Sequence, residues 1–120
     1  MENKETIVVV EDEDQARELL TEILTFEGFK ALGFPNGAEA LIYLEATPTP
    51  PCLVVLDVLM PVMNGRQLRA EMLKKKELAE IPVIVVTALD PSEARDLKPT
   101  RVILKPIDVD ALVNAVRAVC

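Results

Sequence analysis

The chain of 120 residues is 50% hydrophobic but only 3% aromatic, and it carries a net charge of −7 with no histidine. This length predicts a single domain with an aliphatic core and leaves no room for a second domain. The acidic balance argues against direct binding to nucleic acid, and the lack of histidine excludes histidine-ligated zinc sites and Ser-His-Asp hydrolases.

The two cysteines are Cys52, next to a predicted strand, and Cys120, the last residue. Two cysteines in a domain with an ordinary core are typical of reduced cytosolic thiols rather than of a disulfide framework. No apolar run reaches the length of a membrane span, and the N-terminus lacks the apolar segment of a signal peptide. We therefore expect one domain over residues 1–120, in the cytoplasm, with both thiols free.

Short β-branched runs alternate along the chain with segments that carry apolar residues at helical spacing. The first half predicts a strand at 6–10, a helix at about 13–27, a strand at 29–34, a helix at 38–46 and a proline-rich linker at 47–51. The stripe that predicts the first helix consists of Leu19, Leu20, Ile23, Leu24 and Phe26. Gly28 is expected to end that helix, and Asn36 is expected to cap the next one.

The second half continues the alternation and places a carboxylate directly after a buried run. It predicts a strand at 53–56 that ends at Asp57, a helix at about 65–78, a strand at 81–86, a short helix at 91–97, a strand at 101–104 and a last helix capped by Asp108. In the helix at 65–78, Leu68, Met72 and Leu73 are expected to face the core. Five strand–helix pairs predict a doubly wound α/β fold, with a parallel sheet covered on both faces.

Polar residues follow four of the predicted strands. Glu11 and Asp12 follow the first strand, Asp57 the third, Thr87 the fourth and Lys105 the fifth. Taken alone, the acids after the first strand fit an ordinary acidic helix N-terminus, and Thr87 and Lys105 fit ordinary strand ends. The carboxyl ends of parallel strands share one edge of the sheet, however, so these residues are expected to converge there and form a site.

The residue types in this set are suited to phosphoryl chemistry. Three carboxylates a few ångströms apart repel one another unless a cation lies between them, and Mg²⁺ prefers such oxygen ligands and accompanies phosphate. Lys105 would bring a positive charge for a carboxylate or phosphoryl oxygen, and Thr87 a hydroxyl donor. These are the groups needed to attach a phosphoryl group to Asp57.

With these residues in this order, the chain resembles the receiver domain of response regulators in two-component, or phosphorelay, signalling. The resemblance covers the whole chain and rests on Glu11-Asp12, on Leu-Asp-Val-Leu-Met-Pro-Val-Met-Asn-Gly at 56–65, on Thr87-Ala88 and on Lys105-Pro106. It implies a flavodoxin-like (βα)5 sandwich with five parallel strands in the order 2-1-3-4-5. In this family the Lys-Pro peptide is typically cis, which is therefore expected for Lys105-Pro106.

The resemblance also implies a role for each matching residue. Asp57 would be the phospho-acceptor, and it would become an aspartyl phosphate in a magnesium-dependent reaction. The metal ligands would be Glu11, Asp12, Asp57 and the backbone carbonyl of Leu59. Thr87 and the backbone amide of Ala88 would bind the phosphoryl oxygens, with Lys105 pairing opposite.

Two features depart from the family's pattern. Receivers usually have Tyr or Phe three residues before the lysine, where this chain has Val102. From Thr87 to Lys105 there are 105 − 87 = 18 positions, which is about one helical turn of roughly four residues short of the usual receiver. The helix at 91–97 is therefore expected to be short or irregular. Both departures lie on the face formed by 91–97, 101–104 and the last helix, the family's usual output surface and a surface for a homodimer.

The leading interpretation is a phosphoryl-accepting signalling switch that catalyses only its own phosphoryl transfer and dephosphorylation, and is otherwise no enzyme. Its donor would be phosphohistidine on a sensor histidine kinase or a phosphotransfer protein, and its output would go to an unidentified downstream protein. The alternative is a pseudo-receiver that binds partners without phosphorylation. A flavin carrier or an aspartyl phosphatase on the same fold is disfavoured, because acids replace a phosphate-binding loop and Leu59 replaces the second aspartate of the phosphatases.

Overall fold

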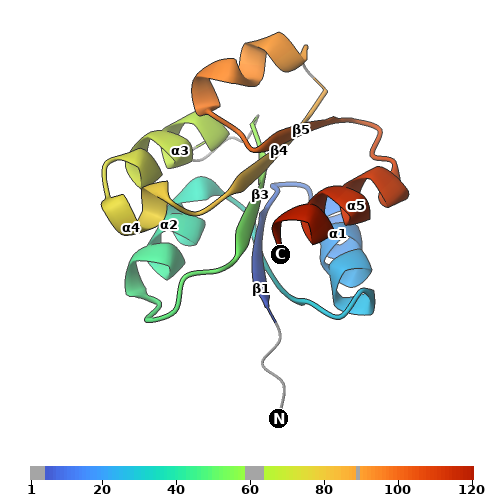
Figure 1. Ribbon diagram of the computed structural model, residues 1–120, viewed down its shortest axis with the longest axis horizontal. Coiled ribbons are helices and arrows are strands. Elements are labelled where there is room, and N and C mark those ends of the chain that lie inside the picture. The colour runs from blue at the N-terminus through green and yellow to red at the C-terminus, as the bar shows by residue number, and fades with distance from the viewer. Residues whose placement is uncertain (1–4, 59–63, 89) are drawn as a thin grey trace.

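A five-stranded parallel sheet forms the centre of the molecule in the computed structural model, which describes residues 5–58, 64–88 and 90–120 (Figure 1). The strands are β1 (Thr6–Val10), β2 (Lys30–Phe34), β3 (Leu53–Asp57), β4 (Val83–Thr87) and β5 (Arg101–Leu104). They pair in the order β2-β1-β3-β4-β5, and every pair is parallel. The predicted doubly wound α/β fold and the strand order implied by the resemblance are both confirmed.

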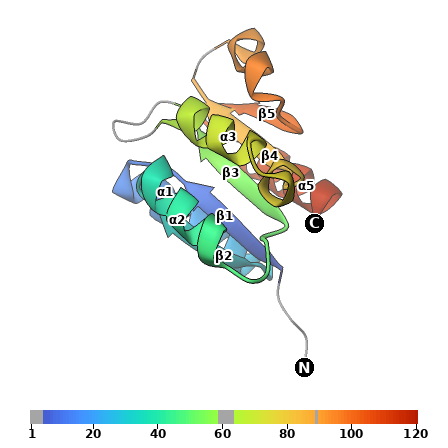
Figure 2. The same cartoon turned by 90° about the vertical axis from the view of Figure 1, so that its left-hand side faces the viewer.

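Helices cover both faces of this sheet. They are α1 (Asp14–Phe26), α2 (Gly37–Ala46), α3 (Gly65–Leu73), α4 (Lys76–Ala79), the 3-10 helix η1 (Pro91–Leu97) and α5 (Val109–Val119). Figures 1 and 2 show α1 and α5 on one face and α2, α3 and α4 on the other. The predicted caps are confirmed, since the side chains of Asn36 and Asp108 accept backbone N–H groups of α2 and α5. Gly28 follows α1 with φ of +98°, as its predicted role requires.

The hydrophobic core is divided by the sheet into two halves. Side chains of a strand point alternately to opposite faces, so Val8 and Val54 pack towards α2 and α3, whereas Val9 and Val55 pack towards α1 and α5. Both faces of β3 and β4 are buried along their whole length, which explains their continuous runs of valine, leucine and isoleucine. The central strands are therefore rigid supports for whatever side chains stand at their ends.

Three details of the helices differ from the sequence-based predictions. The helix expected at 65–78 is two helices, because the amides of Lys74 and Lys75 bond to carbonyls three residues back and Lys75 then adopts an extended conformation. Leu73, expected in the core, is exposed. Leu19 and Phe26 of α1 are also exposed, at 57% and 88%, because only Leu20 and Leu24 of that helix are fully buried against the sheet.

The expected short helix at 91–97 is confirmed as η1, a single 3-10 segment. Pro91 occupies its first turn, and the Asp90 side chain accepts the amide of Ser92. Two buried side chains, Ala94 and Leu97, join the core half under α2 and α3. The segment ends at Lys98, which has a left-handed backbone with φ of 51°.

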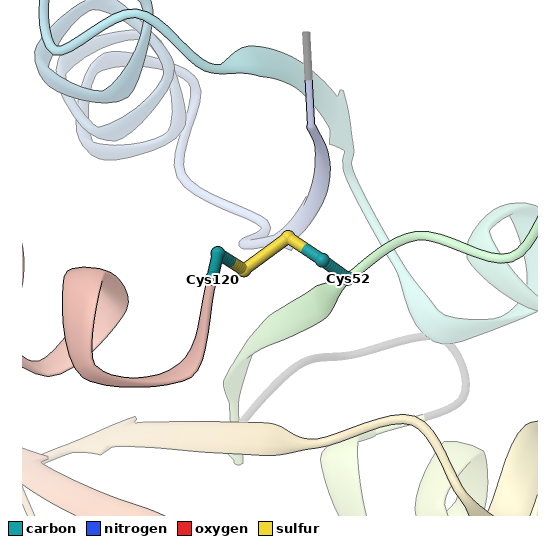
Figure 3. Close-up of a disulfide and its surroundings, with 2 residues drawn as sticks. All are labelled: Cys52 and Cys120. Carbon is teal, nitrogen blue, oxygen red and sulfur yellow. A yellow bond between two sulfur atoms is a disulfide. The ribbon is translucent and has the colours of Figure 1, made fainter. Parts of the chain in front are cut away.

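The two cysteines form a disulfide, so the prediction of free thiols was wrong (Figure 3). Cys52 precedes β3 and Cys120 follows α5, and their Cα atoms lie 6.0 Å apart. The helix α5 runs back across the sheet and brings its end to the amino edge of β3. A sequence separation of 68 residues conceals this proximity.

Among the helices of the described residues, none is both long and apolar enough to cross a lipid bilayer.

Candidate functional site

The carboxyl ends of β1, β3, β4 and β5 bring the predicted site residues to one edge of the sheet. Glu11 and Asp12 directly follow β1, Asp57 and Thr87 are the last residues of β3 and β4, and Lys105 follows β5. The register places Asp57 beside Val86 and Thr87 beside Leu104. Five of the predicted site residues thus stand at the carboxyl ends of four strands.

An acidic cluster forms the centre of this edge. Carboxylate oxygens of Glu11, Asp12 and Asp57 all lie within 4.8 Å of one another. Glu11 and Asp57 are only 2% and 7% exposed, whereas Asp12 is open to solvent. Partial desolvation of the Asp12 carboxylate raises its pKa above the ordinary value of 3.8, and a hydrogen bond with Glu11 and the negative charge of Glu11 raise it further. The cluster therefore carries unfavourable repulsion that a cation would relieve.

Lys105 contributes the positive charge opposite these acids. Its Nζ lies 3.0 Å from Oε1 of Glu11 and 3.3 Å from Oδ2 of Asp57. Burial by itself would lower the pKa of Lys105, but the hydrogen bond to Glu11 and the charges of Asp57 and Glu11 outweigh it and raise the pKa. The lysine is therefore protonated at neutral pH and stands beside the Asp57 carboxylate. The peptide bond from Lys105 to Pro106 is cis, as the resemblance implied.

Hydrogen bonds to the carboxylate and to the backbone carbonyl of Glu11 hold this residue beside Lys105. The Glu13 amide donates to Oε2 of Glu11 at 3.2 Å, and Nη1 of Arg17 donates to the Glu11 carbonyl at 2.9 Å. Both oxygens of the Glu11 carboxylate are therefore engaged, one by Lys105 and one by an amide. Arg17 was not among the sequence-predicted site residues, since a single arginine in a first helical turn gives no signal of its own.

The oxygens present fit a hard divalent cation. All three members of the acidic cluster offer carboxylate oxygens, and no nitrogen or sulfur donor belongs to the group found among the described residues. Carboxylate oxygen sets of this kind suit Mg²⁺, Ca²⁺ or Mn²⁺ rather than zinc or copper. Leu59, whose carbonyl the resemblance assigned to the metal, lies outside the described residues. Ala88 directly follows Thr87 and is exposed.

Gly65 is a further residue on which this site depends, and the sequence did not reveal its role. The Gly65 amide donates to the Val58 carbonyl at 2.9 Å, so the start of α3 lies directly on the end of β3. A Cβ atom here would lie 2.6 Å from the Asp57 carbonyl oxygen and 2.8 Å from Cα of Val58. The backbone next to Asp57 therefore leaves no room for a side chain.

Gly65→Ala is expected to lower the free energy of unfolding by about 2 kcal/mol, because backbone atoms of β3 cannot move aside as a flexible side chain can. Urea denaturation would measure the loss. Gly33→Ala is the matched control, since its Cβ would meet only side-chain atoms of Arg17 and Thr21, at 3.0 Å and beyond. Equal stability of Gly65→Ala and the wild type would contradict this assignment.

Comparison with known proteins links this chain to one protein family. The family described as "Response regulator receiver domain" matches residues 7–117. A probable transcriptional regulator, ycf27 of Porphyra purpurea, is 42% identical over 90 residues, which cover 74% of this chain and 35% of that protein. This chain thus spans about a third of the length of the first curated relatives that it matches. Sporulation initiation phosphotransferase F of Bacillus subtilis is 34% identical, over 94% of this chain and 91% of that protein.

A solved structure of similar sequence is the response regulator protein TrrA of Thermotoga maritima, in complex with Mg²⁺ and BeF. It has a TM-score of 0.85 and 31% identity, and the match covers 97% of this chain and 99% of that one. The family match, the full-length relatives and the strand-end site agree. The chain therefore belongs to the response regulator receiver domain family.

Proposed function

We propose that this domain accepts a phosphoryl group from a phosphohistidine onto Asp57, and that this change switches its binding to a downstream protein. One observation carries the proposal: the Asp57 carboxylate is nearly buried at a strand end, 3.3 Å from Lys105 and within 4.8 Å of two further carboxylates. In the reaction an oxygen of Asp57 bonds to phosphorus as the P–N bond breaks. The leaving imidazole keeps the electron pair of that bond.

The other residues of the site have complementary roles in this proposal. Asp12, Glu11, Asp57 and the Leu59 carbonyl would hold Mg²⁺, which when bound neutralises negative charge on the incoming phosphoryl group. Lys105 is already within hydrogen-bonding distance of Asp57 and would pair with a phosphoryl oxygen. The Thr87 hydroxyl and the Ala88 amide would bind the remaining oxygens. These groups stabilise transferred charge, so the domain is a switch that catalyses only its own phosphorylation and dephosphorylation.

The phosphodonor would be a sensor histidine kinase or a phosphotransfer protein in the cytoplasm. A cavity of about 360 Å³ lies beside the site, between α1 and the start of α5, and Glu11 and Lys105 form part of its wall. The rest of the wall is mainly apolar and includes the exposed side chains of Leu19 and Val109. Exposed apolar groups next to a reactive carboxylate suit the docking of a donor protein.

Incubation with Mg²⁺ and acetyl phosphate, followed by intact mass measurement, tests the proposal. The expected result is a single phosphoryl adduct that does not form when the metal is chelated, since the acidic cluster would then repel the donor. If no adduct forms under any magnesium concentration, the domain is instead a pseudo-receiver. Val102 in place of the usual aromatic residue, and η1 in place of a full helix, are the observations that favour this second function.

Asp12→Asn is expected to stabilise the metal-free domain slightly and to remove most of its response to Mg²⁺. The pKa of Asp12 is raised in the folded state, so folding favours the protonated carboxyl group. The contribution of Asp12 to the stability of the folded state is therefore fully present below pH 3.8 and falls as the pH rises through the folded-state pKa of Asp12. At pH 7 the ionised carboxylate therefore opposes folding, by less than about 1 kcal/mol because solvent screens it.

Thermal denaturation with and without Mg²⁺ would check this prediction. The wild type should gain about 2.7 kcal/mol when Mg²⁺ is at a hundred times its dissociation constant, whereas Asp12→Asn should gain little at the same concentration. Asp110→Asn in the first turn of α5 is the control for the loss of a charge. An equal gain in Asp12→Asn and the wild type would exclude Asp12 as a ligand.

A further inference from the structure

Arg69 of α3 is a buried charged residue that the phosphorylation site does not use. Arg69 is only 6% exposed, and it takes part in none of the ion pairs found among the described residues. Instead Nε donates to the Leu97 carbonyl at 2.8 Å and Nη2 donates to the Lys98 carbonyl at 3.3 Å. The guanidinium therefore binds backbone that lies 28 and 29 residues further along the chain.

The two carbonyls that Arg69 binds are at the end of η1. The last carbonyls of a helix have no partner within the helix and carry partial negative charge. Lys98 has a left-handed backbone, and its amide donates to the Arg95 carbonyl within the segment. A planar guanidinium can donate to two carbonyls at once, which a lysine ammonium does less well. Arg69 thus caps the Leu97 and Lys98 carbonyls, in addition to the backbone bond from Lys98 to Arg95 that closes η1.

A second arginine of α3 reinforces this contact. Arg66 forms an ion pair with Asp96, and it lies on the same side of the helix as Arg69 because the two are three residues apart. Arg66 and its partner are exposed, so their pair contributes little by itself. Among the described residues, the buried Arg69 makes two hydrogen bonds from α3 to the end of η1.

One donor of Arg69 is left unsatisfied in this arrangement. Its Nη1 is buried and has no hydrogen-bond partner among the described residues, and burial lowers the pKa of the guanidinium. A buried donor without an acceptor is unfavourable, so a small movement that offered it a carbonyl or a water molecule would be favoured. The contact between α3 and η1 therefore leaves one buried donor of Arg69 without an acceptor among the described residues.

The two elements joined by Arg69 each begin beside the phosphorylation site. The start of α3 lies on the backbone of Asp57 and Val58, as the position of Gly65 shows. The segment η1 begins at Pro91, four positions after Thr87. Arg69 thus joins two elements whose first residues follow the strands of Asp57 and Thr87, and η1 itself packs on β5 and Val102 in the same core half.

We propose that Arg69 is a positioning residue that caps η1 and couples its position, through α3, to the state of Asp57. The coupling half of this proposal rests on the proposed function, whereas the capping half does not. An arginine connection of this kind would carry the signal to the η1–β5 face in a chain where Val102 cannot make the rotation of an aromatic ring. The hydrogen bonds between Arg69 and the end of η1 lie within the chain, so they form without a partner protein or a ligand.

Amide hydrogen exchange of Arg69→Met tests the cap in the unmodified protein. The peptide at 91–98 is expected to exchange about tenfold faster than in the wild type, while peptides of β1 and β3 stay within about twofold, because only local opening is changed. Arg101→Met, which removes an exposed arginine from β5, is the matched control and should leave all three regions unchanged. Unchanged exchange at 91–98 in Arg69→Met would overturn the proposal.

The same measurement with Mg²⁺ and beryllium fluoride tests the coupling. In the wild type the analogue should slow exchange both at the β3 end and at 91–98, whereas in Arg69→Met only the β3 response should remain. Arg69→Lys, which keeps the charge but has one donor group, should recover part of the response at 91–98, and it replaces the methionine variant if that variant does not fold. A full response at 91–98 in Arg69→Met would overturn the coupling.

Failure of the proposed function gives a different result. If the wild type shows no response at the β3 end, the phosphoryl site is absent, and the comparison of unmodified proteins still decides whether Arg69 caps η1.

Discussion

Asp57→Asn is expected to abolish the phosphoryl adduct, with a rate of formation lower by on the order of a thousandfold or more. An amide is a far weaker nucleophile than a carboxylate, and the two remaining carboxylates of the cluster are placed differently. Glu11 is already bound at both oxygens, by Lys105 and by the Glu13 amide, and Asp12 stands at a different strand end. Intact mass after incubation with Mg²⁺ and acetyl phosphate would measure the loss.

The loss in this variant should not come from unfolding. Asparagine has nearly the shape of aspartate, and the substitution removes one of three mutually repelling charges while Lys105 keeps its contact with Glu11. The unfolding midpoint in urea, measured without metal, is therefore expected to stay equal or to rise. Asp110→Asn, at an exposed position of α5, controls for the change in net charge and should be modified at the wild-type rate. A normal adduct in Asp57→Asn would place the acceptor elsewhere.

Removal of the disulfide is expected to have the largest effect on stability. Closing a loop of 68 residues restricts the unfolded chain and contributes about 4 kcal/mol on the chain-entropy relation. Cys52→Ser or Cys120→Ser should therefore lower the thermal midpoint by roughly 10–20 °C under oxidising conditions. Differential scanning calorimetry would measure the shift.

The two cysteines also provide their own control. Because either substitution removes the same bond, the double variant should be no less stable than the single ones by more than about 0.5 kcal/mol. A thiol reductant should lower the midpoint of the wild type and leave the serine variants unchanged. The rate of adduct formation should not change, since the bond joins the amino edge of β3 and the site lies at the carboxyl end of that strand. Single variants as stable as the wild type would show that the bond does not form in solution.

Local patterns in the sequence were enough to predict most of the elements and the polar residues that stand at the strand ends. Alternation and β-branched runs predicted all five strands, and Asn36 and Asp108 predicted the starts of two helices. The acids, threonine and lysine at strand ends predicted a common edge because parallel strands have their carboxyl ends together. Compared with the usual receiver, the 18 positions between Thr87 and Lys105 predicted a shortened helix, which the structure shows as η1.

Contacts between distant segments were beyond these patterns. Arg69 and Leu73 are four residues apart and lie on the same side of α3. Arg69 is nevertheless buried, with Nε bonded to the Leu97 carbonyl, whereas Leu73 is exposed. The apolar stripe of α1 likewise contains Leu19 and Phe26, which the sheet does not cover.

The sequence by itself determined the type of fold, the order of its elements and which residues stand at the strand ends, because these follow from chain periodicity and the direction of parallel strands. Only the tertiary structure decided that Cys52 meets Cys120, that Gly65 lies on Asp57 and that Arg69 caps η1. In each of these contacts, two segments that are not adjacent in the sequence lie next to each other in the fold. Such contacts depend on how helices pack on the finished sheet, and no local pattern encodes that.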